Sequence, residues 1–191
     1  FDIVPDYDLD IMKDRQSVTK ITTGVLRGLE QVIHDAMPDI VLVHGDTTTT
    51  FAGALAAFYN KVKIGHVEAG LRTYNKYEPF PEEMNRVLTS SLADLHFAPT
   101  QRAKENLLRE GVNAKKIFVT GNTAIDSLKL TLNDTHVFKE SILNSIDFDK
   151  SRVITVTAHR RENLGEPLKE ICHAILHIVD QYDDVEIVYP V

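Results

Sequence analysis

The amino-acid sequence predicts an α/β fold built on parallel strands. Short runs of apolar residues alternate along the whole chain with longer segments in which apolar residues recur every three to four positions. This alternation is typical of parallel strands joined by crossover helices. Charged and small residues also gather directly after the apolar runs. These positions are the carboxyl ends of the predicted strands, where ligands bind in such sheets.

Each element of the first part of the chain has its own signal. Apolar residues spaced three and four apart predict an amphipathic helix from Val18, and Pro38 follows its end. The continuous apolar run 40–43 predicts a strand that is covered on both faces. An alanine-rich segment, 51–58, predicts a second helix, and the run 62–67 predicts the next strand.

Capping residues delimit the elements that follow. Pro81 is expected to open a helix at its first position, with two glutamates in the favoured first turn. After a strand over 95–98, Thr100 is expected to cap a helix that ends at Gly111. The remaining predicted elements are a strand over 117–120, a helix over 124–132, a strand over 153–157, a helix opened by Pro167 with Cys172 on its apolar face, and a strand over 185–188.

The sequence also predicts two domains within a longer protein. It opens at Phe1 without a methionine and stops directly after the last apolar run, so we expect that both ends are cut. We place the domain boundary after Gly121, which makes 1–121 the first domain, with its first part missing, and 122–191 the start of the second.

Composition excludes several classes of protein. The 191 residues include 21 lysines and arginines against 28 aspartates and glutamates, a formal net charge of -7, which argues against a nucleic-acid partner. One cysteine excludes a disulfide framework and a zinc site made of cysteines alone, and it fits a reducing cytoplasm. No apolar run is long enough for a transmembrane helix, so no membrane partner is expected.

Three carboxylates are candidates for acid–base chemistry, and each has a structural alternative. Asp46 follows a predicted strand, but it could instead cap the next helix. Glu68 ends another strand and could instead pair with Arg72. Glu82 could interact with the dipole of its helix, and Arg86, four residues further on, could form a surface pair with it.

A basic cluster follows the predicted strand 153–157. His159, Arg160 and Arg161 precede Asn163 and the approach to the next helix, a combination that suits an anion such as a pyrophosphate. The alternative is a solvated run of charges. Neither the glycine fingerprint of dinucleotide-binding folds nor a phosphate-binding P-loop is present. The acids and this cluster together predict acid–base chemistry on a phosphorylated ligand.

Four sequence blocks carry a resemblance to a known family. They are HGDTTTTFAGALAAFY (44–59), HVEAGLRTYNKYEPFPEEMNR (66–86), VTGNTAID (119–126) and TAHRRENLG (157–165). In this order they resemble the non-hydrolysing UDP-N-acetylglucosamine 2-epimerases of bacteria. The resemblance implies two Rossmann-like domains in a GT-B arrangement, the second one incomplete here, with the active site between them. It also implies a homodimer that needs no metal and no cofactor.

The resemblance implies a reaction and a set of residue roles. UDP-GlcNAc and UDP-ManNAc would be interconverted by elimination of UDP, which gives 2-acetamidoglucal, and by its re-addition, and the product would serve cell-surface polysaccharide. Asp46, Glu68 and Glu82 match the family's three acid/base carboxylates, and His159 matches the histidine that stabilises the departing UDP. Arg86 matches a position near the site, and the substrate-binding residues would also include Arg160, Arg161 and Asn163.

Two other classes of function compete with this interpretation. A GT-B glycosyltransferase or a nucleotide-sugar-binding protein would need no proton exchange at C2 of the sugar. A metal-dependent phosphoesterase would need an Asp-x-His motif before Gly45 and a histidine after Asn122, and the sequence has neither.

Overall fold

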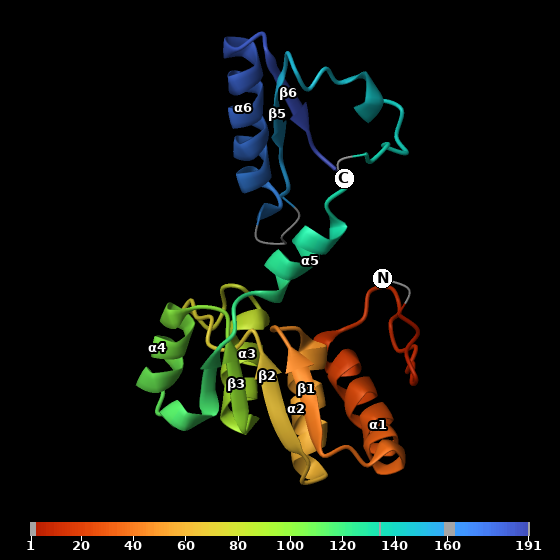
Figure 1. The fold of residues 1–191 in the computed structure, drawn as a ribbon, viewed down its shortest axis with the longest axis vertical. Helices are drawn as coiled ribbons and strands as arrows, with labels where there is room; N and C mark the ends of the chain where they lie inside the picture. Colours follow the sequence, from red (N-terminus) through yellow and green to blue (C-terminus); the bar gives the residue numbers. More distant parts are fainter. Residues whose placement is uncertain (1–2, 134, 159–162, 191) are drawn as a thin grey trace. The chain divides into compact units, whose positions relative to one another are not determined.

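The chain consists of two compact units, 1–132 and 133–191. The computed structural model describes residues 3–133, 135–158 and 163–190, which Figure 1 draws as a ribbon. Both units combine helices with parallel strands, so the predicted α/β class is confirmed. Among the described residues, no helix has both the length and the apolar character that crossing a bilayer requires.

The first unit is a four-stranded parallel sheet whose strands lie side by side in chain order. The strands are β1 (Ile40–His44), β2 (Lys63–Val67), β3 (Leu95–Ala98) and β4 (Ile117–Val119). The helices are α1 (Val18–Ala36), α2 (Thr48–Tyr59), α3 (Glu82–Leu92), α4 (Gln101–Arg109) and α5 (Thr123–Thr131), with a short 3-10 helix, η1 (Ala114–Lys116). Each predicted element of this unit is present, with ends shifted by a few residues.

The turns that follow the strands continue the hydrogen-bonding ladder of the sheet. His44 pairs in register with Val67, and Val67 pairs with Phe97. Beyond these pairs, the Gly45 amide donates to the Val67 carbonyl at 3.0 Å and the Ala69 amide donates to the Phe97 carbonyl at 3.0 Å. The segments after β1 and β2 therefore lie next to each other at one edge of the sheet.

Small residues allow α2 to pack closely on the sheet. The core there joins Val43 and Ile64 of the strands to Ala54, Ala56 and Ala57 of the helix. The prediction that β1 is covered on both faces is wrong for one of them, because Leu42 is 61% exposed. On that face Leu42 nevertheless packs closely over Gly65 of the neighbouring strand. A Cβ added to Gly65 would lie only 2.6 Å from Leu42 Cδ2.

Two capping residues differ from the sequence-based expectation. Pro81 is the N-cap of α3 and not its first helical residue. Glu110 is the C-cap of α4, and Gly111 follows it with a φ of 85°. The contacts of α5 make it part of the first unit. The predicted domain boundary after Gly121 concerns the whole protein and stays a prediction.

The second unit contains two parallel strands and one long helix. They are β5 (Arg152–Thr155), β6 (Val185–Val188) and α6 (Glu166–Gln181), preceded by a 3-10 turn, η2 (Leu143–Ser145). Cys172 is exposed, so the expectation that it lies in a core is wrong within this structure. The physical reason is that a two-stranded sheet cannot cover the apolar face of α6, which has no buried residue.

Gly70 fixes the segment after β2 against α4. Its φ is 87°, and a Cβ at this position would lie 2.3 Å from the Ala103 carbonyl oxygen and 2.9 Å from Leu107 Cγ. The Asn106 side-chain amide donates to the Gly70 carbonyl at 2.9 Å. Only glycine combines this backbone conformation with so close an approach.

We expect Gly70→Ala to lower the free energy of unfolding by about 3 kcal/mol or more, since the added methyl meets backbone atoms of α4. Gly111→Ala is the matched control, because Gly111 also has a positive φ but no atom within 4 Å of its added Cβ. It should cost only about 1–2 kcal/mol of backbone strain. Urea unfolding followed by circular dichroism measures both values, and equal losses would contradict the close-contact explanation.

Candidate active site

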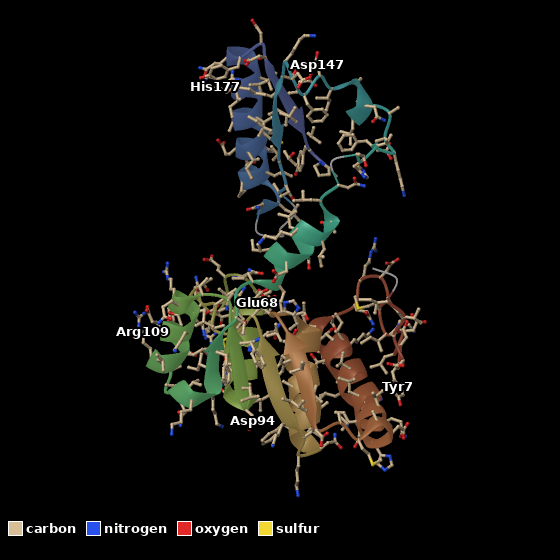
Figure 2. All side chains as sticks on the ribbon, in the orientation of Figure 1. Tyr7, Glu68, Asp94, Arg109, Asp147 and His177 are labelled. Carbon is tan, nitrogen blue, oxygen red and sulfur yellow. The ribbon has the colours of Figure 1, made fainter. Side chains whose placement is uncertain are left out.

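Polar side chains meet at the carboxyl edge of the four-stranded sheet. Figure 2 shows Glu68 at this edge and Asp94 at the opposite one. Asp46 lies in the turn after β1, Glu68 in the turn after β2, and Glu82 in the first turn of α3. The three predicted carboxylates thus come from neighbouring elements, and each has different surroundings.

Asp46 does not cap the helix that follows it. Thr47 is the N-cap of α2, and its hydroxyl accepts a hydrogen bond from the Thr50 amide at 3.2 Å. The Asp46 carboxylate instead accepts from Arg86 Nη2 at 2.5 Å. The capping explanation for Asp46 is therefore wrong, and its side chain belongs to a contact between the turn after β1 and α3.

Two buried side chains hold the backbone on which Asp46 sits. His66 Nε2 lies 2.8 Å from the Gly45 carbonyl oxygen, and the Asn85 amide donates to the carbonyl of Asp46 itself at 2.8 Å. A carbonyl only accepts, so Nε2 of His66 is the donor. Both peptide groups around Asp46 are fixed from inside the protein, which sets the direction of its side chain.

Burial lowers the pKa of His66 to about 4, against an ordinary value of 6.5. The nearby His96 and Arg72 charges act in the same direction, whereas the bond to Gly45 and the charge of Asp46 oppose the shift. His96 is the register partner of His66 on β3, and burial lowers its pKa too. Both imidazoles are therefore neutral near pH 7, and His66 acts as a neutral donor to the Gly45 carbonyl.

Glu68 is not the partner of Arg72. Arg72 forms a two-pronged ion pair with Glu110, at 2.8 Å through Nε and 2.7 Å through Nη2. Glu68 Oε2 lies 3.4 Å from Nε2 of His44. The φ of Glu68 is 65°, a conformation that costs free energy for a residue with a side chain and that concentrates at functional sites.

The two glutamates of α3 have different surroundings. Glu83 is 2% exposed, and it accepts from the amides of Thr73 at 3.1 Å and Tyr74 at 2.9 Å. It also accepts from Arg86 Nη1 at 3.2 Å, so the alternative explanation, a surface pair of Arg86 with Glu82, is wrong. Glu82 has one buried oxygen, Oε2, that has no hydrogen-bond partner among the residues that the structure describes. A buried oxygen without a partner is expensive unless a ligand or water satisfies it.

Sequence reasoning missed several members of this arrangement. The sequence pattern predicts for Glu83 only an interaction with the helix dipole, although its spacing of three from Arg86 also fits an ion pair. His44, His66 and Asn85 received no role, and their contacts depend on strand register and helix position rather than on local spacing.

Part of the predicted site lies outside the described residues. His159, Arg160 and Arg161 belong to this part, whereas Asn163 is described and half-buried in the second unit. In the ranges 3–133, 135–158 and 163–190, no group of three or more histidine, cysteine, aspartate or glutamate side chains is arranged to hold a metal ion.

Comparison with known proteins identifies the family. A family model described as UDP-N-acetylglucosamine 2-epimerase matches residues 1–191. The chain belongs to the UDP-N-acetylglucosamine 2-epimerase family. The 2-epimerase of Bacillus subtilis strain 168 is 58% identical over 191 residues, which cover 100% of this chain and 49% of that protein. The resemblance found in the sequence is therefore confirmed.

Solved structures of 2-epimerases have the same fold. The Neisseria meningitidis enzyme bound to UDP-GlcNAc matches with a TM-score of 0.89 and 51% identity, over 98% of this chain and 52% of that one. The Methanocaldococcus jannaschii 2-epimerase in complex with UDP-GlcNAc and UDP matches with a TM-score of 0.78 and 36% identity, over 98% and 51%. The chain spans about half the length of the curated relatives it matches.

Substitutions of the two neighbouring glutamates of α3 should differ in their effect on stability. We expect Glu83→Gln to lower the free energy of unfolding by about 3 kcal/mol, since it removes a buried charge and leaves Arg86 with one fewer partner. Glu82→Gln is the matched variant, and its stability should stay within about 1 kcal/mol of wild type, because Oε2 has no partner to lose among the described residues. Urea unfolding of both variants tests this, and a larger loss for Glu82→Gln would contradict it.

His66 should make the protein sensitive to acid. Its pKa is about 4 in the folded protein and near 6.5 when unfolded, so the unfolded state binds the extra proton between these values. Its stabilising contribution is complete above about pH 6.5 and is lost as the pH falls towards 4. Between pH 7 and 4, wild type should lose about 3 kcal/mol more than His66→Gln does. Urea unfolding at a series of pH values measures the free energy of unfolding of both proteins. An equal loss in the two proteins between pH 7 and 4 would show the prediction to be wrong.

Proposed function

We propose that this chain belongs to a non-hydrolysing UDP-N-acetylglucosamine 2-epimerase, which interconverts UDP-GlcNAc and UDP-ManNAc. The observation that carries the proposal is the set of carboxylates at one sheet edge in a chain of this family. Asp46 is oriented by Arg86, Glu68 lies beside His44, and Glu82 keeps a buried oxygen with no partner in the described part of the chain. These three groups have the chemistry that inversion at C2 needs.

The chemistry follows from the position of the reacting carbon. C2 of the sugar has no neighbouring carbonyl group within the ring, so its proton cannot leave to give an enolate. A carboxylate removes the C2 proton, the C–H electron pair forms the C1–C2 double bond of 2-acetamidoglucal, and UDP leaves with the electrons of the C1–O bond. Re-addition of UDP with a proton delivered to the opposite face completes the inversion. Two faces require more than one acid/base group, and Asp46, Glu68 and Glu82 supply them.

The departing UDP carries the developing negative charge. We assign its stabilisation to His159, with Arg160, Arg161 and Asn163 as further substrate contacts, because cationic side chains lower the cost of a forming phosphate anion. The proposal includes two Rossmann-like domains in a GT-B arrangement, with the second domain providing this cluster, and a homodimeric enzyme in the cytoplasm. Proton transfer and elimination require neither a metal nor a redox cofactor.

Deuterium exchange at C2 distinguishes the epimerase from a glycosyltransferase or a nucleotide-sugar-binding protein. We expect the full-length protein in D2O to form UDP-ManNAc from UDP-GlcNAc and to place deuterium at C2, which proton NMR detects. Asp46→Asn, Glu68→Gln and Glu82→Gln should each lower turnover by about 100-fold or more. Glu105→Gln, an exposed acid on α4, should have no effect. A wild-type protein that binds the nucleotide without C2 exchange would refute the epimerase proposal.

A further inference from the structure

An imidazole with no assigned role lies beside Glu68. His44 is the last residue of β1, and its Nε2 is 3.4 Å from Oε2 of Glu68 and 3.3 Å from the hydroxyl oxygen of Thr123. The three side chains come from β1, from the turn after β2 and from the first turn of α5. They therefore belong to three separate elements that meet at the carboxyl edge of the sheet.

The sheet itself sets this juxtaposition. His44 pairs in register with Val67, the residue directly before Glu68, so the backbones that carry the imidazole and the carboxylate are fixed by the ladder between β1 and β2. Glu68 then adopts a φ of 65°, which is disfavoured by about 1–2 kcal/mol for a residue with a side chain. An exposed pair of flexible side chains would need neither feature.

The side chains of Glu68 and His44 differ in their exposure to solvent. The Glu68 side chain is 25% exposed, whereas that of His44 is 57% exposed. The imidazole thus lies between a largely covered carboxylate and water. Imidazole is the side chain that most readily accepts and releases protons near neutral pH. The arrangement suits a group that passes protons between a covered acid and solvent.

We propose that His44 exchanges protons between Glu68 and solvent during epimerisation, an inference that rests on the proposed function. When Glu68 has become a carboxylic acid, its O–H bond breaks and an N–H bond forms at Nε2 of His44. A carboxylate and an imidazolium remain, and the imidazolium then releases its proton to water. When Glu68 has given up its proton to the sugar, the same steps run in reverse. The Thr123 hydroxyl oxygen lies 3.3 Å from the same Nε2, so it can accept a hydrogen bond from the N–H that forms there and orient the ring.

A purely orienting role for His44 makes different predictions. Glutamine in place of histidine retains a side-chain group that can contact Glu68 and Thr123, but it cannot carry a proton. An orienting role should therefore survive His44→Gln, whereas proton exchange should not. His34, an exposed histidine beside Asp35 on α1, provides the matched control through His34→Gln.

The test compares proton exchange with epimerisation in the full-length protein. Wild type, His44→Gln, His44→Ala and His34→Gln are incubated in D2O with UDP-GlcNAc and, separately, with UDP-ManNAc. NMR then gives the deuterium at C2 of the recovered starting nucleotide relative to the amount of epimer formed. We expect His44→Gln to lower kcat about tenfold or more at an unchanged KM. In His44→Gln we also expect this ratio to fall for the nucleotide whose C2 hydrogen faces Glu68. Without His44, Glu68 cannot exchange the proton that it removed from C2 with solvent, so it returns the same proton to C2. Added imidazole should restore part of the rate of His44→Ala.

Each other result would overturn the inference. Wild-type turnover and an unchanged exchange ratio in His44→Gln would remove His44 from the proton path and leave the proposed function intact. A slow His44→Gln whose exchange ratio is unchanged would show that its loss of rate does not come from proton exchange, and it would overturn the inference. If wild type itself shows no exchange at C2, the proposed function is wrong and the inference is wrong with it. Because the exchange ratio is read on His44→Gln, a poorly folded His44→Ala does not affect the test.

Discussion

The arrangement of the site depends on the contact of Arg86 with two carboxylates. Its guanidinium donates to Asp46 from the turn after β1 and to Glu83 from its own helix. All three side chains are largely covered, and taking charges out of water is costly unless the charges are well paired. This pairing holds α3 against the end of β1. Glu83 also accepts hydrogen bonds from the amides of Thr73 and Tyr74, which connects the loop before α3 to the same cluster. The position of Glu82 follows from this, because it is the residue before Glu83.

Backbone hydrogen bonds of the sheet also position the candidate site. The turns after β1 and β2 continue the hydrogen bonding of the sheet, so Asp46 and Glu68 start from positions that neighbouring strands define. Buried neutral groups then fix the details, with His66 and Asn85 on the carbonyls around Asp46 and Asn106 on that of Gly70. A site built in this way is organised before any substrate arrives, which is the condition for efficient electrostatic stabilisation.

The sequence predicted the elements of the fold well because its signals are local. Apolar periodicity and capping residues placed the strands and helices of the first unit to within a few residues. The partners of charged residues were harder to predict. Arg72 pairs with Glu110, 38 residues away, because Gly70 brings the segment after β2 onto α4. Likewise, the contact of His44 with Glu68 depends on the register of β1 and β2, which no local pattern encodes. The positions of the three carboxylates after strands and at a helix start made them candidates, and the family resemblance implied their acid/base roles, whereas the groups that orient them required the structure.

The neighbouring glutamates of α3 constrain how this segment can change in evolution. Successive side chains leave a helix about 100° apart, so the rotation of α3 about its axis decides which glutamate is covered and which keeps an unpartnered oxygen. Glu83, Asn85 and Arg86 fix that rotation through contacts outside the helix. Insertions in the middle of the loop before α3 would leave the rotation unchanged. One residue inserted between Glu83 and Asn85 would instead move both acids back by one position relative to Asn85 and Arg86, so Glu83 would leave its covered place. This stretch should therefore accept substitutions far more readily than changes of length.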